Sequence, residues 1–207
     1  MLAAYWRKTG WKRFCVMVIG NVFVGMGLGL FKMSSMGNAP YDGMNMAISA
    51  VAGIYYPTFQ VLMNLVLFAV QLAAGRKLIG IGTIVNAVFV GYIGMFFYNL
   101  FGSQCGWPET FVVRLLTVGI GVVVSLGLSM YQQSDVGVAP YDSLALILDR
   151  RLPKVSYFWC RMLTDGVCAL VCFLFGGIIG FGTLATVFGL GPIIHFFDSH
   201  LTKKILG

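Results

Sequence analysis

One six-residue pattern, Gly-x-Ala-Pro-Tyr-Asp, occurs twice in the chain, at residues 37–42 and 137–142. Proline is favourable in the first turn of a helix because its missing N–H would have no partner there, and the residue before a proline prefers an extended conformation. A helix is therefore predicted to begin at each proline, with the aspartate in its first turn, where a carboxylate suits the positive end of the helix dipole. The predicted site residues in these copies are Pro40, Tyr41, Asp42, Pro140, Tyr141 and Asp142.

A second pattern, Gly-x-Gly-Thr, occurs at residues 80–83 and 180–183. Glycines let helix backbones approach closely, and a buried threonine hydroxyl can donate a hydrogen bond across helices. Two interpretations of Thr83 and Thr183 remain open: tight helix packing, and a role in lining a pore.

Isolated polar residues interrupt long apolar segments at Asn64, Asn86 and Asp165. Burying an ionisable residue in such a segment is costly, so Asp165 is a functional candidate. Alternatively, Asp165 pairs with Arg161, which lies four residues earlier on the same helix face. The sequence contains no Gly-rich phosphate loop, Ser/His/Asp grouping or His-Glu-x-x-His string. We therefore expect no enzyme, no cofactor and no metal site.

Composition predicts that lipid surrounds these residues. Charged residues make up 10% of the 207-residue chain and hydrophobic residues 58%, whereas a soluble domain carries roughly 25% charged residues. In lipid every backbone polar group must be paired within the protein, so the spans are helices or a closed barrel. The apolar segments approach the length of a spanning helix, whereas barrel strands alternate over about 10 residues. Helices are therefore predicted.

Six apolar segments are predicted to span the bilayer. They are residues 14–33, 57–75, 79–101, 111–131, 156–175 and 178–198. We therefore predict an all-α polytopic membrane protein that forms a single membrane domain over residues 1–207, with the lipid bilayer as its surroundings.

The basic residues predict the orientation of the chain. If the N-terminus is cytoplasmic, only Lys32 and Arg114 of the 14 lysines and arginines fall on the outer side. Short loops rich in lysine and arginine stay in the cytoplasm, so both termini are predicted to be cytoplasmic. The cytoplasmic set includes Arg161, Lys203 and Lys204.

The chain resembles itself when residue 37 is aligned with residue 137. About twenty of some ninety aligned positions are identical without a gap. This predicts two internal repeats, residues 13–102 and 113–202, each with three spans. An odd number of spans forces the second copy to enter from the opposite side, as in transporters built from inverted repeats.

The helices predicted after Pro40 and Pro140 are too short to cross the bilayer. They end near Gly53 and Arg151, whereas a spanning helix needs about 20 residues. Each is therefore re-entrant with its N-terminus lining a cavity, or interfacial with a solvated aspartate. Recurrence in both repeats favours the cavity. If transport is coupled to protons, a carboxylate there would titrate near neutral pH, because burial disfavours its charged form.

The two repeated patterns, with the basic pair Arg76-Lys77 before the third span, resemble those of the YczE/YitT-like small bacterial integral membrane proteins. The resemblance covers about residues 13–197. It implies a multi-pass protein of the bacterial cytoplasmic (inner) membrane, and it implies no particular mechanism. One departure is Gly176-Gly177, which stands where the first copy has its basic pair, in a turn predicted to be external.

We expect a small-solute secondary transporter whose site lies between the two repeats and takes a small molecule or an ion. One alternative is the substrate-binding membrane subunit of a vitamin-type uptake system, which needs an energising partner subunit. Another is a non-transporting assembly or interaction protein. A homo-oligomer is compatible with all three, and no nucleic-acid partner is expected. The predicted substrate-binding residues outside the Pro-Tyr-Asp copies are Thr83, Thr183, Asn86, Asn64 and Asp165.

Overall fold

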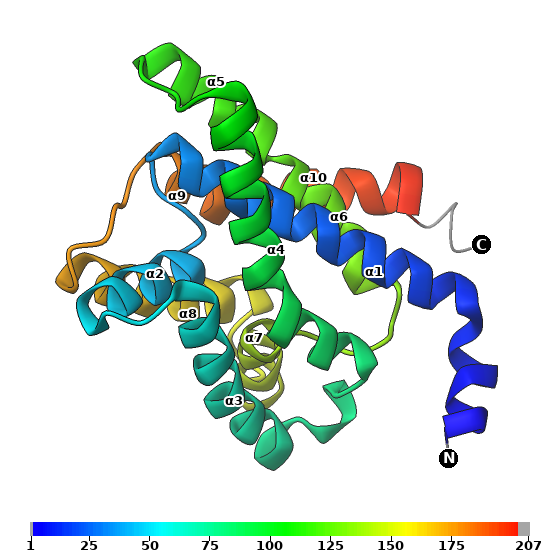
Figure 1. Cartoon of the computed structure of the whole chain (residues 1–207). Coiled ribbons are helices and arrows are strands. Elements are labelled where there is room, and N and C mark those ends of the chain that lie inside the picture. Colours follow the sequence, from blue (N-terminus) through cyan, green and yellow to red (C-terminus); the bar gives the residue numbers. More distant parts are fainter. Residues whose placement is uncertain (1, 203–207) are drawn as a thin grey trace.

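The computed structural model describes residues 2–202, which form helices joined by short loops (Figure 1). In chain order the elements are α1 (Leu2–Ser34), α2 (Pro40–Ala52), α3 (Tyr56–Ala74), η1 (Arg76–Leu78), α4 (Ile81–Cys105), α5 (Phe111–Gly121), α6 (Val123–Gln133), α7 (Pro140–Arg151), α8 (Tyr157–Leu174), α9 (Phe181–Leu184), η2 (Ala185–Gly189), α10 (Leu190–Phe197) and η3 (Asp198–Thr202). Lys203 and Lys204, which are predicted to be cytoplasmic, lie outside the described part of the chain.

Five helical segments in the described residues are long and apolar enough to cross a membrane. They are Gly10–Ser34, Tyr56–Ala74, Ile81–Cys105, Phe111–Gln133 and Tyr157–Leu174. These segments agree with five of the six predicted spans and confirm an all-α polytopic membrane protein.

The sixth predicted span, 178–198, is less regular than the other five. The described chain is helical from Phe181 to Thr202, but η2 and η3 are π-helical, so no single α-helix reaches spanning length. Pro192 lies in the following helix and cannot donate a backbone hydrogen bond to the preceding turn. Wider π turns of this kind occur frequently at functional sites.

The helices form two groups, and each group contains helices from both halves of the sequence (Figure 1). In the first group, α1 packs against α4, α5 and α6, and α10 packs against α6. In the second group, α2 and α7 pack against α8, and α3 packs against α2 and α7. Contact between α3 and α4 joins the two groups. Neither half of the sequence therefore folds as a separate body.

Glycines allow α1 and α6 to approach at backbone distance. A methyl group added to Gly20 would lie 2.8 Å from the carbonyl oxygen of Gly127, and one added to Gly27 would lie 2.5 Å from Cβ of Val124. Because the residue number rises along α1 as it falls along α6, the two helices run antiparallel. Such close approach of small residues is a general way of packing helices in lipid.

Each Gly-x-Ala-Pro-Tyr-Asp loop packs against the Gly-x-Gly-Thr helix start of the other half. The backbone N–H of Gly82 donates to the carbonyl of Val136 at 2.9 Å, and the N–H of Gly182 donates to the carbonyl of Met36 at 2.8 Å. These two bonds satisfy N–H groups that have no partner within their own helices. The loops that lead into α2 and α7 are therefore held by the opposite half.

The short helices begin at the predicted prolines. Ala39 and Ala139 precede them with extended backbone, at ψ 140° and 144°. Helix α2 has 13 residues and ends at Gly53, whose left-handed conformation (φ 65°) suits a glycine. At about 1.5 Å per residue both helices are much shorter than the roughly 30 Å hydrocarbon core. The first two residues of each helix are buried.

A methyl group added at either helix start should disturb the docking of the loops. The substitution Gly80→Ala would bring Cβ to 2.0 Å from the carbonyl oxygen of Val136, and Gly180→Ala would bring it to 2.6 Å from that of Met36. We expect each variant to lose about 1–3 kcal/mol of stability through overpacking. Thermal unfolding in detergent measures this loss.

The matched control is Gly119→Ala in α5, because no atom lies within 4 Å of the added methyl group. Alanine is the better helix former, so this variant should be as stable as the parent or more stable. Equal unfolding temperatures for all three variants would contradict the docking described here.

Candidate functional site

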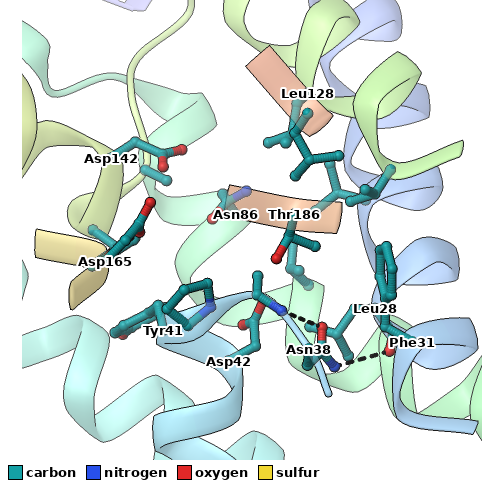
Figure 2. A pocket seen from close by; sticks show the side chains of 18 of the residues that line it. Leu28, Phe31, Asn38, Tyr41, Asp42, Asn86, Leu128, Asp142, Asp165 and Thr186 are labelled. Atoms are coloured by element: carbon teal, nitrogen blue, oxygen red, sulfur yellow. Dashed lines mark hydrogen bonds between the residues drawn. The ribbon is translucent and has the colours of Figure 1, made fainter. Parts of the chain in front are cut away.

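A cavity of about 100 Å³ lies between the two groups of helices. Figure 2 shows the carboxylates of Asp42, Asp142 and Asp165 and the polar ends of Asn86 and Thr186 arranged around it. Of the predicted site residues, those that line the cavity are Pro40, Tyr41, Asp42, Asn64, Asn86, Tyr141, Asp142 and Asp165. Eight of the eleven predicted residues, drawn from both halves, thus meet in one place.

The cavity is unusually acidic for this chain. The whole sequence has seven aspartates and glutamates, and three of them line this one space, together with one cation, Arg161. Charged groups are rare in the interior of membrane proteins because removing them from water is costly, and they mark functional sites.

Arg161 connects the two carboxylates of the second half. Its Nη1 lies 2.6 Å from Oδ1 of Asp142, and its Nε lies 3.3 Å from Oδ2 of Asp165. The pairing predicted between Arg161 and Asp165 is therefore present, and Asp142 joins it. Arg161, which the orientation analysis counted with the cytoplasmic residues, thus lies near the start of α8 and lines the cavity.

Asp42 has neutral partners. Its Oδ1 accepts hydrogen bonds from Oη of Tyr56 at 3.3 Å and from Nε2 of Gln60 at 3.0 Å. Among the described residues no lysine or arginine forms an ion pair with it. Asp42 lies in α2, outside the five spans, and burial raises the pKa of its carboxyl group above the ordinary value by disfavouring the charged form.

Two tyrosines join the short helices at the edge of the cavity. The rings of Tyr41 and Tyr141 stack with centroids 4.3 Å apart and an angle of 10° between their planes. The Oη of Tyr41 donates to Oδ1 of Asn64 at 2.8 Å, and the Oη of Tyr141 donates to Oδ1 of Asp165 at 2.5 Å. The guanidinium carbon of Arg161 lies 5.0 Å from the centre of the Tyr141 ring. Equivalent side chains of the two halves therefore meet face to face.

Amide side chains complete the polar lining. Nδ2 of Asn86 donates to Oδ1 of Asn21 at 2.8 Å, which orients the Asn86 side chain. Nδ2 of Asn38 donates to the carbonyl oxygen of Leu28 at 3.3 Å (Figure 2). Thr186 lies in the π-helical segment η2 and donates to the carbonyl oxygen of Thr183 at 2.8 Å.

Three predicted site residues do not line the cavity: Thr83, Thr183 and Pro140. Oγ1 of Thr83 donates to the carbonyl oxygen of Val138 at 2.8 Å, which reinforces the docking of the opposite loop. Both threonines are buried. These contacts match the packing interpretation of the Gly-x-Gly-Thr pattern and not the pore-lining one.

The sequence analysis missed four polar residues that line the cavity, namely Asn38, Gln60, Arg161 and Thr186. Gln60 was detectable because it lies one helical turn before Asn64 in the same apolar segment. Thr186 was detectable as the counterpart of Asn86. Asn38 occupies the variable position of its pattern, where the second copy has valine, so repetition gives no signal there.

Comparison with known proteins places this site in a family whose members have no established activity. Residues 11–199 match the model of a family of unknown function, DUF6198. The chain is 28% identical to the uncharacterized protein YyaS of Bacillus subtilis over 91% of this chain and 93% of the relative. It is 22% identical to the uncharacterized membrane protein YczE of the same organism, over 86% of this chain and 81% of the relative.

An uncharacterized protein of Haemophilus influenzae is 22% identical over 90% of this chain and 84% of the relative. No solved structure matches the chain. The resemblance to YczE-like proteins is confirmed, and the family match covers the spans, both short helices and every residue of the cavity. The chain therefore belongs to the DUF6198 family of membrane proteins.

Proposed function

We propose that the protein is a secondary transporter of a small solute, with the acidic cavity as its solute site. The observation that carries this proposal is the meeting of Asp42 and Asp142, each in the first turn of a non-spanning helix, in one cavity. Non-spanning helices that begin at a polar site between repeats are a recurring feature of secondary transporters. A protein that served only as a scaffold would gain nothing from the cost of burying this charge.

We further propose that the two halves are inverted repeats related by a pseudo-two-fold axis in the membrane plane. Reciprocal contacts support this relation, because each loop docks on the helix start of the opposite half through equivalent residues. The antiparallel packing of α1 with α6 and the stacking of Tyr41 on Tyr141 also support it. Transport in such folds follows from tilting one repeat against the other around a fixed site.

Two surface hollows support access from both faces. One, of about 330 Å³, is lined by residues that include Lys32 and Tyr98, and it shares Phe31 and Asn38 with the central cavity. The other, of about 350 Å³, is lined by residues that include Arg13 and Lys77 near the opposite end of α1.

The barriers between these hollows and the cavity stand at equivalent positions. Phe31 and Asn38 separate the cavity from the first hollow. Their counterparts on the side of the second hollow are Tyr131 and Val138. Tyr131 is fully buried. The carbonyl oxygen of Val138 accepts hydrogen bonds from the side chains of Thr83 and Gln71. The Val138 carbonyl is thus held by two side chains of the other half of the sequence, which suits a transporter closed toward that side.

The proposed orientation places both termini in the cytoplasm of a bacterial inner membrane and the end of α4 outside. Cys105 is an exposed free cysteine at that end. A membrane-impermeant maleimide should therefore label Cys105 in spheroplasts, and Cys105→Ser should remove this label. A cysteine introduced as Lys77→Cys should react only after permeabilisation, and labelling of Lys77→Cys in intact spheroplasts would overturn the orientation.

The transport proposal predicts that both motif carboxylates are needed for flux. Purified protein would be screened by thermal shift against a library of small metabolites, and each hit would be measured as uptake into proteoliposomes. We expect the double variant Asp42→Asn, Asp142→Asn to fold but to lose at least nine-tenths of uptake. A loss of this size corresponds roughly to one or two hydrogen bonds between the solute and a charged carboxylate.

Glu109→Gln is the matched control, because it removes one charge from an exposed loop residue. It should transport like the parent. Full uptake by the double variant would leave the two aspartates with a helix-capping role only.

A further inference from the structure

The charge of the cavity is not balanced by the protein. Three carboxylates face one guanidinium, that of Arg161. Lys32 is the nearest candidate for a second cation, but it lines the first surface hollow and not the cavity. Its Nζ lies 4.6 Å from the centre of the Tyr98 ring and donates to the sulfur of Met95. An excess of negative charge in one cavity favours occupation by a cation.

The second half of the chain shows how such a carboxylate is neutralised. The guanidinium of Arg161 lies against Asp142 and over the face of Tyr141. The first half has equivalent contacts made by neutral groups. Nε2 of Gln60 donates to Asp42 where Arg161 donates to Asp142. Oη of Tyr41 donates to Asn64 where Oη of Tyr141 donates to Asp165. The guanidinium of one half is therefore replaced by the neutral amide of Gln60 in the other, and the charge of Asp42 has no cationic partner among the described residues.

The remaining lining suits an organic cation better than a metal ion. Among the described residues, no group of three or more histidine, cysteine or acidic side chains is arranged to hold a metal. The lining includes the aromatic rings of Phe31 and Tyr41, and aromatic faces attract ammonium and guanidinium groups. Amide groups of Asn38 and Asn64 lie in the same lining and suit the polar N–H groups of such a cation.

We propose that the solute carries an ammonium or guanidinium group, and that Asp42 binds this group in the way that Asp142 binds Arg161. The inference rests on the proposed transport function for its biological meaning, but binding alone can test it. Asp42 is the residue of choice because it is the one carboxylate of the cavity without a cationic partner among the described residues.

The test compares a cation with a neutral molecule of the same shape. Titration calorimetry of the detergent-solubilised full chain would measure binding of methylguanidinium, methylurea, tetramethylammonium and sodium chloride at pH 8. We expect methylguanidinium to bind about tenfold or more tightly than methylurea, because a hydrogen bond to a charged partner contributes about 1.5–3 kcal/mol. Binding should weaken as the pH falls, since protonation of Asp42 removes its charge.

Three variants assign the binding to Asp42. Asp42→Asn should weaken methylguanidinium binding about tenfold or more, Asp42→Glu should retain a large part of it, and Glu109→Gln should bind like the parent. Gel filtration and thermal unfolding establish that each variant is folded. Rescue by glutamate separates a lost charge from a disturbed helix start.

The outcomes divide clearly. Equal binding of methylguanidinium and methylurea, unchanged binding in folded Asp42→Asn, heat from sodium chloride alone, or no binding of either organic cation would each overturn the inference. Uptake of a neutral or anionic solute into proteoliposomes would overturn it while leaving the transport function intact. Asp42-dependent binding without flux of any bound cation would uphold the inference and contradict the transport function.

Discussion

The structure depends on the exchange of backbone hydrogen bonds between the halves, in which Gly182 donates to Met36 and Gly82 to Val136. The first N–H groups of a helix have no partners within the helix, and leaving them buried and unpaired costs free energy. Here the loop of one half supplies the missing acceptor for the other. The same contact fixes the last residues before Pro40 and Pro140, and so it sets where the short helices begin.

The acidic cavity follows from that arrangement. Because both short helices are held by the opposite half, their first turns converge, the rings of Tyr41 and Tyr141 stack, and the following aspartates face one space. The halves then diverge in chemistry. Asp142 is neutralised by Arg161, whereas Asp42 keeps only neutral donors. Equivalent contacts in the two halves thus carry an asymmetric distribution of charge.

Local chemistry made much of this predictable. Pro40 and Pro140 start helices because proline is favourable in the first helical turn, and the apolar segments reveal five spans directly. The docking of Thr83 on Val138 was not predictable, since it joins residues far apart in the sequence and a single chain gives no signal for such pairs. The last span departed from expectation because the chain adopts π turns before Pro192. The link between Arg161 and Asp142 was not predictable either, because it depends on how α7 packs on α8.

The central claim is that the two short helices meet at one shared site, and a double-mutant cycle on Tyr41 and Tyr141 tests it most directly. Unfolding free energies of Tyr41→Leu, Tyr141→Leu and the double variant would be measured in detergent, with the corresponding phenylalanine cycle as the control that keeps both rings. Stacked rings predict a coupling of about 0.5–1.5 kcal/mol in the leucine cycle and a smaller one in the phenylalanine cycle. Additive leucine substitutions would mean that the rings do not touch, and would contradict the shared site.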